Sequence, residues 1–248
     1  MKAAWYEKTG EAQTVLQIGE LDNPVPNKGE VLVQLKTSGI NPSDVKTRAG
    51  ARGELQFPKI IPHSDGAGTI VDVGEGVDKN RIGERVWIWN GAFGRAFGTC
   101  AELISLPEFQ AAKINDSVDF KSAACMGIPA STAYYGIFAN GSVKDKTVLI
   151  SGGAGAVGFY GIQLAKLSGA NVISTISSDE KGKVAQEAGA DKVINYKNED
   201  VVEEIMNYTD NKGVDRIFEV EFGGNLSINE KVLKLSLIHI SEPTRPSS

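Results

Sequence analysis

A short glycine motif between a predicted strand and a predicted helix constrains this chain more than any other sequence feature. Gly153, Gly155 and Gly158 form the pattern G-x-G-x-x-G, which follows a buried-strand run at 147–151 and opens an amphipathic run at 156–168. In such a unit the first glycine permits a tight turn, the second lets a pyrophosphate approach the backbone, and the third lets helix and strand pack closely. The motif predicts a dinucleotide site at the helix N-terminus. A glycine-rich turn without a ligand is the alternative.

The second half of the chain alternates between strand and helix patterns. Short apolar runs of strand length are followed by amphipathic runs of helix length, and glycine follows two of the predicted helices. This order is typical of a parallel sheet whose strands are joined by crossover helices. We therefore predict an α/β half with strands at 147–151, 171–176, 192–196 and 214–220 and helices at 156–168, 179–188 and 200–208.

The first half has a different pattern. Apolar residues alternate with polar ones in short runs, and turns rich in Gly, Pro and Asn separate the runs, as in antiparallel β structure. One short helix is predicted at 42–48, and a longer one at 119–138, broken near Gly127-Ile128-Pro129. At about 150 residues per domain, a chain of 248 residues suits two domains. We place them at 1–120 and 121–234, and the remaining residues, 235–248, fit neither pattern.

Composition excludes several classes of protein. The 26 Lys and Arg residues against 31 Asp and Glu give a net charge of -5, which disfavours a nucleic-acid partner. The two cysteines, Cys100 and Cys125, cannot form a disulfide framework, so a reducing compartment is expected. Because no run approaches ~18 apolar residues and the N-terminus lacks a signal-peptide pattern, we expect a cytoplasmic protein without a membrane anchor.

The end of the second strand of the α/β half bears on cofactor choice. An NAD-binding site would place an acidic residue there against the ribose hydroxyls, but the chain has Ser177 and Ser178, followed by Lys181. Asp179 and Glu180 are interpreted as first-turn residues of the next helix, near the positive end of its dipole. Lys181 can reach a 2′-phosphate, so NADPH is favoured. Alternatively, Lys181 is only a solvated helix residue.

The order of a β-rich half and then an α/β half resembles the medium-chain dehydrogenase/reductase superfamily. More narrowly, six segments are similar to the NADPH:quinone oxidoreductases related to zeta-crystallin, in the zinc-independent branch. The resemblance covers residues 1–234 and implies a GroES-like catalytic domain followed by a Rossmann sheet, both incomplete. The segments are 39–44, 64–68, 83–86, 127–129, 153–158 and 193–196.

The resemblance also indicates chemistry without a metal. Zinc-dependent members of the superfamily have a cysteine where Asn41 stands and a histidine where Ser64 stands. His63 alone cannot form a metal site, and a local hydrogen bond is the expected role of this histidine. Without a Lewis acid, no group is present to convert an alcohol into the alkoxide from which hydride transfer would proceed. A quinone accepts hydride directly and needs mainly close approach and a polar group to stabilise the reduced oxygen.

By resemblance, Asn41 lies near the nicotinamide and the substrate, where its amide would stabilise a developing oxyanion. Alternatively, Asn41 is only a turn residue before Pro42. Lys46 and Arg52 stand where relatives often carry tyrosines, so with Ser64 they would line a more cationic substrate pocket. Alternatively, Tyr196 is a buried aromatic residue at the end of a strand and has no role in ligand binding. The cofactor-binding residues implied are Thr132, Gly152, Gly153, Gly155, Ala156, Val157, Gly158, Ser177, Ser178, Lys181 and Tyr196.

Two other functions remain open. A reductase of α,β-unsaturated carbonyls, such as an enoyl thioester reductase, would use the same cofactor and hydride geometry. A non-catalytic crystallin-like or RNA-binding role is the other, and the net charge of -5 argues against the RNA-binding form of it. Segment 235–248 resembles translated cloning-adapter sequence, with a natural exposed tail as the alternative. Because the family pattern continues with further strands after residue 234, the resemblance implies that this chain is a fragment of a longer protein, which would be a homodimer when complete.

Overall fold

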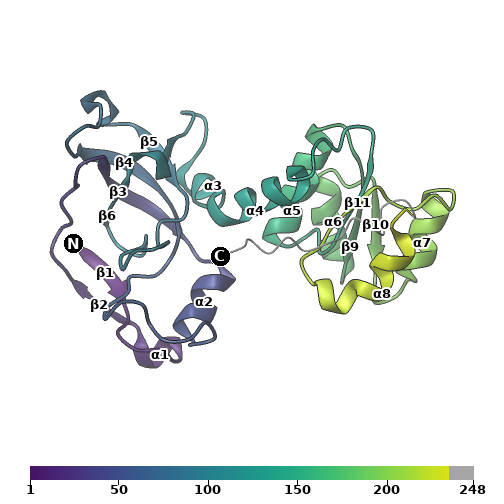
Figure 1. Cartoon of the computed structure of the whole chain (residues 1–248), viewed down its shortest axis with the longest axis horizontal. Coiled ribbons are helices and arrows are strands. Elements are labelled where there is room, and N and C mark those ends of the chain that lie inside the picture. The colour runs from purple at the N-terminus through teal and green to yellow at the C-terminus, as the bar shows by residue number, and fades with distance from the viewer. Residues whose placement is uncertain (235–248) are drawn as a thin grey trace. The chain divides into compact units, whose positions relative to one another are not determined.

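The computed structural model describes residues 1–234 and divides the chain into two compact units (Figure 1). The first unit is Met1–Ile128, and the second begins at Pro129, so that the boundary falls within helix α4 (Gly127–Phe138). The predicted tail, 235–248, lies outside the described residues. Each unit has its own hydrophobic core.

A five-stranded antiparallel sheet forms the centre of the first unit. Its strand order is β6-β3-β4-β5-β7, with β3 (Glu30–Gly39) and β4 (Asp65–Val73) as the longest strands. Val31 and Val33 of β3 are fully buried because alternate side chains of a strand point to the same face. The other strands are β5 (Arg85–Ile88), β6 (Leu103–Pro107) and β7 (Ala111–Lys113), with β1 (Lys2–Trp5) and β2 (Gln17–Glu20) in a separate antiparallel pair.

Short helices lie between these strands. The predicted helix at 42–48 is confirmed as α2 (Pro42–Arg48), which begins with a proline and has the backbone N–H of Asn41 donating to the Asp44 carboxylate at 2.8 Å. The predicted interruption is also confirmed, because one helix ends at Ala124 and α4 begins at Gly127. Pro129 lies in the first turn of α4, where proline is tolerated. The remaining helices are α1 (Ala12–Val15), α3 (Phe120–Ala124), η1 (Lys79–Arg81) and η2 (Glu108–Gln110).

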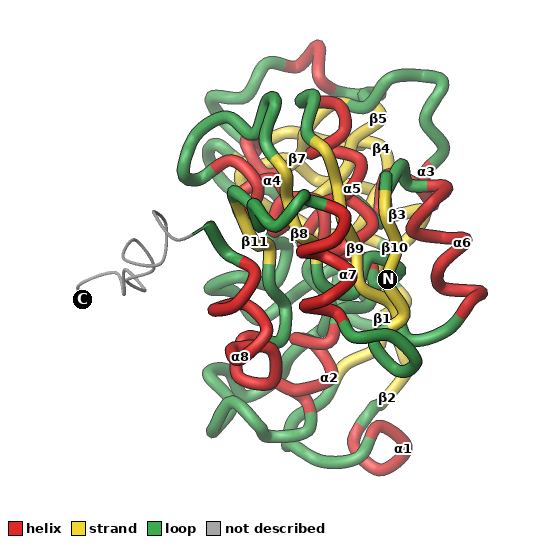
Figure 2. Tube along the Cα trace, turned by 90° about the vertical axis from the view of Figure 1, so that its right-hand side faces the viewer, coloured by secondary structure: helices red, strands yellow, loops and turns green. Residues whose placement is uncertain are grey.

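The second unit contains a parallel sheet of four strands in the order β10-β9-β8-β11 (Figure 2). The strand predicted at 214–220 is shorter than expected. The backbone N–H of Val214 donates instead to the carbonyl of Val232, and Val214 forms an isolated bridge to Leu233. The strands are β8 (Thr147–Ile150), β9 (Asn171–Ile176), β10 (Lys192–Asn195) and β11 (Arg216–Phe218).

Helices cover both faces of this parallel sheet. Val148 and Ile150 pack into a core with α5 (Ala156–Leu167) and α6 (Asp179–Glu187). Leu149, between them in β8, packs into the opposite core with α7 (Val201–Tyr208) and α8 (Phe222–Val232). This alternation confirms the predicted doubly wound α/β half. Among residues 1–234, no helix has the length and hydropathy needed to cross a membrane.

The close approach of β3 and β4 generates a stability prediction. A Cβ added at Gly68 would lie 2.1 Å from the carbonyl oxygen of Gln34, a backbone atom that cannot move aside without breaking the sheet. We expect Gly68→Ala to lower the free energy of unfolding by about 2 kcal/mol or more, measured by urea denaturation. Gly223→Ala is the control, because a Cβ there meets nothing within 4 Å and helix α8 gains propensity. An unchanged urea midpoint for Gly68→Ala would contradict the prediction.

Candidate functional site

The glycine loop of the second unit connects β8 to α5. Gly152 has φ +67°, a conformation that favours glycine. A Cβ at Gly158 would lie 2.4 Å from the carbonyl oxygen of Gly152, and one at Gly153 would lie 2.1 Å from the Ser174 hydroxyl. Gly155 is exposed, and its nearest obstacle to a Cβ is 3.2 Å away. Close contacts therefore require glycine at positions 153 and 158, the backbone conformation favours it at position 152, and Gly155 leaves the backbone open to a ligand.

The N-terminus of α5 fits an anionic ligand. Gly155 is the N-cap residue, and no side chain caps the helix there. Unpaired N–H groups at a helix N-terminus, together with the helix dipole, bind phosphate groups. Ala156 is exposed and Val157 is half-buried in this first turn. The predicted residues 152–158 thus form a cradle that suits a dinucleotide pyrophosphate.

The structure brings two of the predicted 2′-phosphate residues into contact. The Lys181 ammonium donates a hydrogen bond to the Ser177 hydroxyl at 2.8 Å, just beyond the carboxyl end of β9. Ser178 serves as the N-cap of α6, where its hydroxyl accepts from the backbone N–H of Lys181. Tyr196 follows β10 and is 53% exposed, so the buried alternative for this tyrosine is wrong. Thr132 is an exposed residue of α4.

A buried amide–carboxylate pair is the central polar feature of the first unit. Asn41 donates from Nδ2 to Oδ2 of Asp65 at 2.8 Å, and the backbone N–H of Ile128 donates to Oδ1 at 2.8 Å. Both side chains are almost completely buried. Burial raises the pKa of Asp65 to about 6, although the two hydrogen bonds oppose the shift. Sequence reasoning missed Asp65, whose only signal was its place in the segment 64–68.

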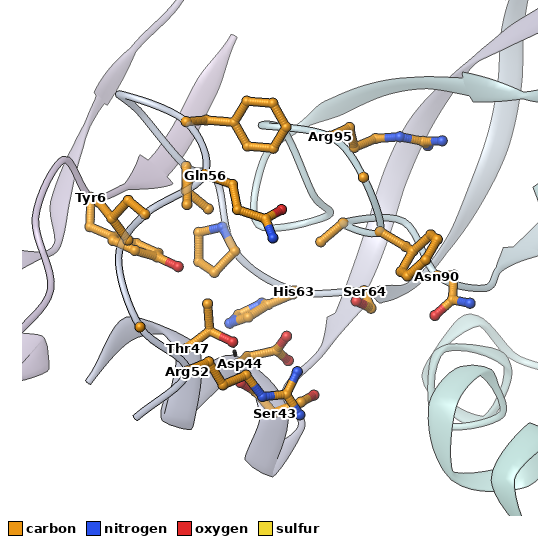
Figure 3. Close-up of a pocket in the computed structure, with 18 of the residues that line it drawn as sticks. Tyr6, Ser43, Asp44, Thr47, Arg52, Gln56, His63, Ser64, Asn90 and Arg95 are labelled. Atoms are coloured by element: carbon orange, nitrogen blue, oxygen red, sulfur yellow. Dashed lines mark hydrogen bonds between the residues drawn. The ribbon is translucent and has the colours of Figure 1, made fainter. Parts of the chain in front are cut away.

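A pocket of about 580 Å³ lies in the first unit (Figure 3). Arg52 and Ser64, both predicted, are among its lining residues, together with Asp44, Tyr6 and His63. Burial raises the pKa of Asp44, against a hydrogen bond from Asn41 and the positive charge of Arg52. Two predicted residues are not among the lining residues of this pocket, namely Lys46, which is exposed on α2, and Asn41, which is buried.

His63 has the local hydrogen bond that the sequence predicted. Its Nδ1 lies 2.9 Å from the Ser38 hydroxyl, which in turn lies 2.9 Å from the Thr99 hydroxyl. Within residues 1–234, no three His, Cys, Asp or Glu side chains gather in a way that could hold a metal ion.

Comparison with known proteins places these features in a family. A model described as "Alcohol dehydrogenase GroES-like domain" matches residues 27–148, and one described as "Zinc-binding dehydrogenase" matches residues 156–229. A solved alcohol dehydrogenase superfamily protein from Novosphingobium aromaticivorans is 30% identical, with a TM-score of 0.84, over 94% of this chain and 70% of that one. The chain therefore belongs to the medium-chain dehydrogenase/reductase superfamily, with the GroES-like and Rossmann-type halves of its members.

Within the superfamily, the chain is a homologue of the quinone oxidoreductases. It is 28% identical to human quinone oxidoreductase over 92% of this chain and 68% of the relative. The structure of Escherichia coli quinone oxidoreductase complexed with NADPH matches with a TM-score of 0.80 and 28% identity, over 94% of this chain and 70% of that one. The chain thus spans about two thirds of the length of these relatives.

The buried Asp65 carboxyl generates a pH prediction. Its pKa in the folded state, about 6, lies above the ordinary value of 3.8, so the folded state holds a proton that the unfolded state has lost between these values. The free energy of unfolding should therefore fall as pH rises from about 4 to about 6, by on the order of 2–3 kcal/mol.

Asp65→Asn is the matched variant for this prediction. A neutral amide removes the charge, and the Asn41 amide can turn over to accept a hydrogen bond from it. Urea denaturation across this pH range should show a smaller decline for the variant than for the unchanged chain. Equal slopes for the two proteins would contradict the assignment of the decline to Asp65.

Proposed function

We propose that this chain carries the active site of an NADPH-dependent quinone reductase that works without a metal ion. The observation that carries the proposal is the buried Asn41–Asp65 pair. By the resemblance, Asn41 and Ser64 stand where zinc-dependent members have a cysteine and a histidine, so the site offers an amide and a carboxylate in place of a zinc-ligand set. The similarity to proteins named quinone oxidoreductase supports the same substrate class.

The second unit would hold NADPH. The backbone of residues 152–158 and the N-terminus of α5 suit the pyrophosphate, and the Lys181–Ser177 pair suits the 2′-phosphate. Tyr196 and Thr132, both exposed, would contact the adenosine and the nicotinamide respectively. When bound, NADPH supplies the hydride.

The first unit would hold the quinone in the pocket that Arg52 and Ser64 line. Asp65 accepts one N–H of the Asn41 amide and thereby fixes its orientation. Asn41 does not itself line this pocket, whereas its neighbours Ser43 and Asp44 do. As the resemblance implies, the second N–H of the Asn41 amide would stabilise the negative charge that develops on the quinone oxygen. Lys46 is exposed on α2, the helix that also carries the lining residues Ser43, Asp44 and Thr47, and it would add positive charge on that side. The homodimer and the cytoplasmic location stay predictions.

The preference for NADPH can be tested at Lys181. A charge-assisted hydrogen bond is worth roughly 1.5–3 kcal/mol, so Lys181→Ala should weaken NADPH binding about ten-fold or more while NADH binding changes little. Isothermal titration calorimetry or quenching of protein fluorescence measures both affinities.

Lys183→Ala is the matched control for this test, since Lys183 is exposed on the same helix. Equal losses of NADPH affinity in the two variants would show that only general charge is involved. An equal loss of NADH affinity in Lys181→Ala would contradict a contact with the 2′-phosphate.

The reaction itself can be tested by following NADPH oxidation at 340 nm with the purified chain. We expect turnover with 1,4-benzoquinone or 1,2-naphthoquinone, little turnover with 2-cyclohexenone, and the same rate before and after dialysis against EDTA. Turnover of the enone alone would establish the unsaturated-carbonyl reductase instead. Loss of the rate on chelation would contradict chemistry without a metal.

A further inference from the structure

His63 stands in a backbone conformation that a histidine rarely adopts. Its φ is 78°, in the left-handed region that favours glycine and costs other residues conformational energy. The residue follows Pro62 and lies three positions after Ile60, whose backbone N–H and carbonyl form hydrogen bonds with the backbone of Tyr6. In the view of Figure 3, the ring lies between Gln56 on one side and Thr47 on the other. The strained backbone thus presents an imidazole to the pocket.

A chain of hydrogen bonds fixes the protonation of this ring. Thr99 donates its only hydroxyl proton to the backbone carbonyl of Asp65 at 2.6 Å, so the Thr99 oxygen can only accept from Ser38. The Ser38 hydroxyl proton is then committed to Thr99, and the Ser38 oxygen must accept from Nδ1 of His63. In the neutral ring, Nδ1 therefore carries the proton and Nε2 has the free lone pair.

The free nitrogen is the one available to a ligand. His63 lines the pocket, and no residue in the described part of the chain bonds to Nε2. Because Nδ1 stays protonated in both charge states, the proton that comes and goes is the one on Nε2. The titratable or charged groups that line the same pocket are Tyr6, Asp44, Arg52, Glu54 and Arg95.

The charges around the ring suit a group that gains and loses a proton. Burial lowers the pKa of His63 below its ordinary value of 6.5, and the Asp44 carboxylate opposes this shift. The positive charge of Arg52 in turn opposes the rise in the pKa of Asp44 that burial causes.

We propose that His63 is the proton donor to the quinone oxygen in this pocket. The inference rests on the proposed function. The hydride brings two electrons and one proton to the quinone and leaves a hydroquinone monoanion. The imidazolium Nε2–H bond breaks, its proton forms the new O–H bond, and the electron pair stays on Nε2. The neutral ring then takes a proton from water, while Ser38 and Thr99 keep Nδ1–H in place.

The tautomer can be measured without any reaction. In the His239→Gln variant, His63 is the only histidine, and two-dimensional ¹⁵N NMR of the imidazole at pH 8 reports which nitrogen carries the proton. We expect the Nδ1–H form. In a variant that also carries Ser38→Ala, Nδ1 loses its acceptor, so the Nε2–H form should become the major one. A predominantly Nε2–H ring in the presence of Ser38 would overturn the proposal.

Kinetics test the proton transfer. The kcat/KM for 1,4-benzoquinone should fall as pH rises through the pKa of His63, since only the imidazolium donates. His63→Asn keeps a residue that tolerates positive φ and removes the titration, so we expect kcat lower by about 100-fold at the acidic plateau and no fall at this pKa. His63→Gly, which removes the backbone strain, should behave in the same way and excludes a folding defect as the cause.

The possible outcomes separate the two proposals. If the chain without substitutions reduces quinones and His63→Asn shows the same rate and the same pH profile, the role of His63 is overturned and the proposed quinone reductase activity stands. Restored activity in His63→Gly alone would assign the loss to strain and also overturn it. Absence of quinone turnover in the unchanged chain contradicts the proposed function and this inference together.

Discussion

The carboxylate of Asp65 is the interaction on which the first unit depends. It begins strand β4 and accepts hydrogen bonds from the Asn41 side chain, at the start of α2, and from the backbone of Ile128, in the first turn of α4. Its backbone carbonyl accepts from Thr99. A buried charge is costly unless hydrogen bonds surround it. The fold supplies these bonds, and in doing so it fixes the ends of two helices relative to the central sheet.

The same constraint reaches the pocket. Because Thr99 donates its hydroxyl proton to the Asp65 carbonyl, the donor and acceptor roles are fixed in the series of hydrogen bonds from Thr99 through Ser38 to His63. One buried strand end therefore orients the Asn41 amide through its side chain and the His63 imidazole through its backbone. Hydrogen bonds to the backbone carbonyl of Asp65 and from the backbone N–H of Ile128 therefore help to hold the polar groups of this site in place.

The second unit depends on close packing instead. Gly158 must lack a Cβ because the helix passes the Gly152 carbonyl, and Gly153 must lack one because Ser174 of the neighbouring strand approaches it. These contacts fix the first turn of α5 against the sheet. The exposed N-terminus of α5 and the Lys181–Ser177 pair then lie beyond the carboxyl ends of β8 and β9, where parallel sheets bind their ligands.

The sequence by itself determined the features that depend on neighbours along the chain. The glycine loop, the alternation of strands and helices, the cap of α2 and the nearness of Ser177 to Lys181 all follow from residues a few positions apart, whose geometry is local. Only the tertiary structure decided the partners of Asp65 and His63. Asn41 and Asp65 are 24 positions apart, and Ser38 and Thr99 are 61 apart. No sequence period encodes such pairings, since they arise where β3, β4 and the loops beside them meet.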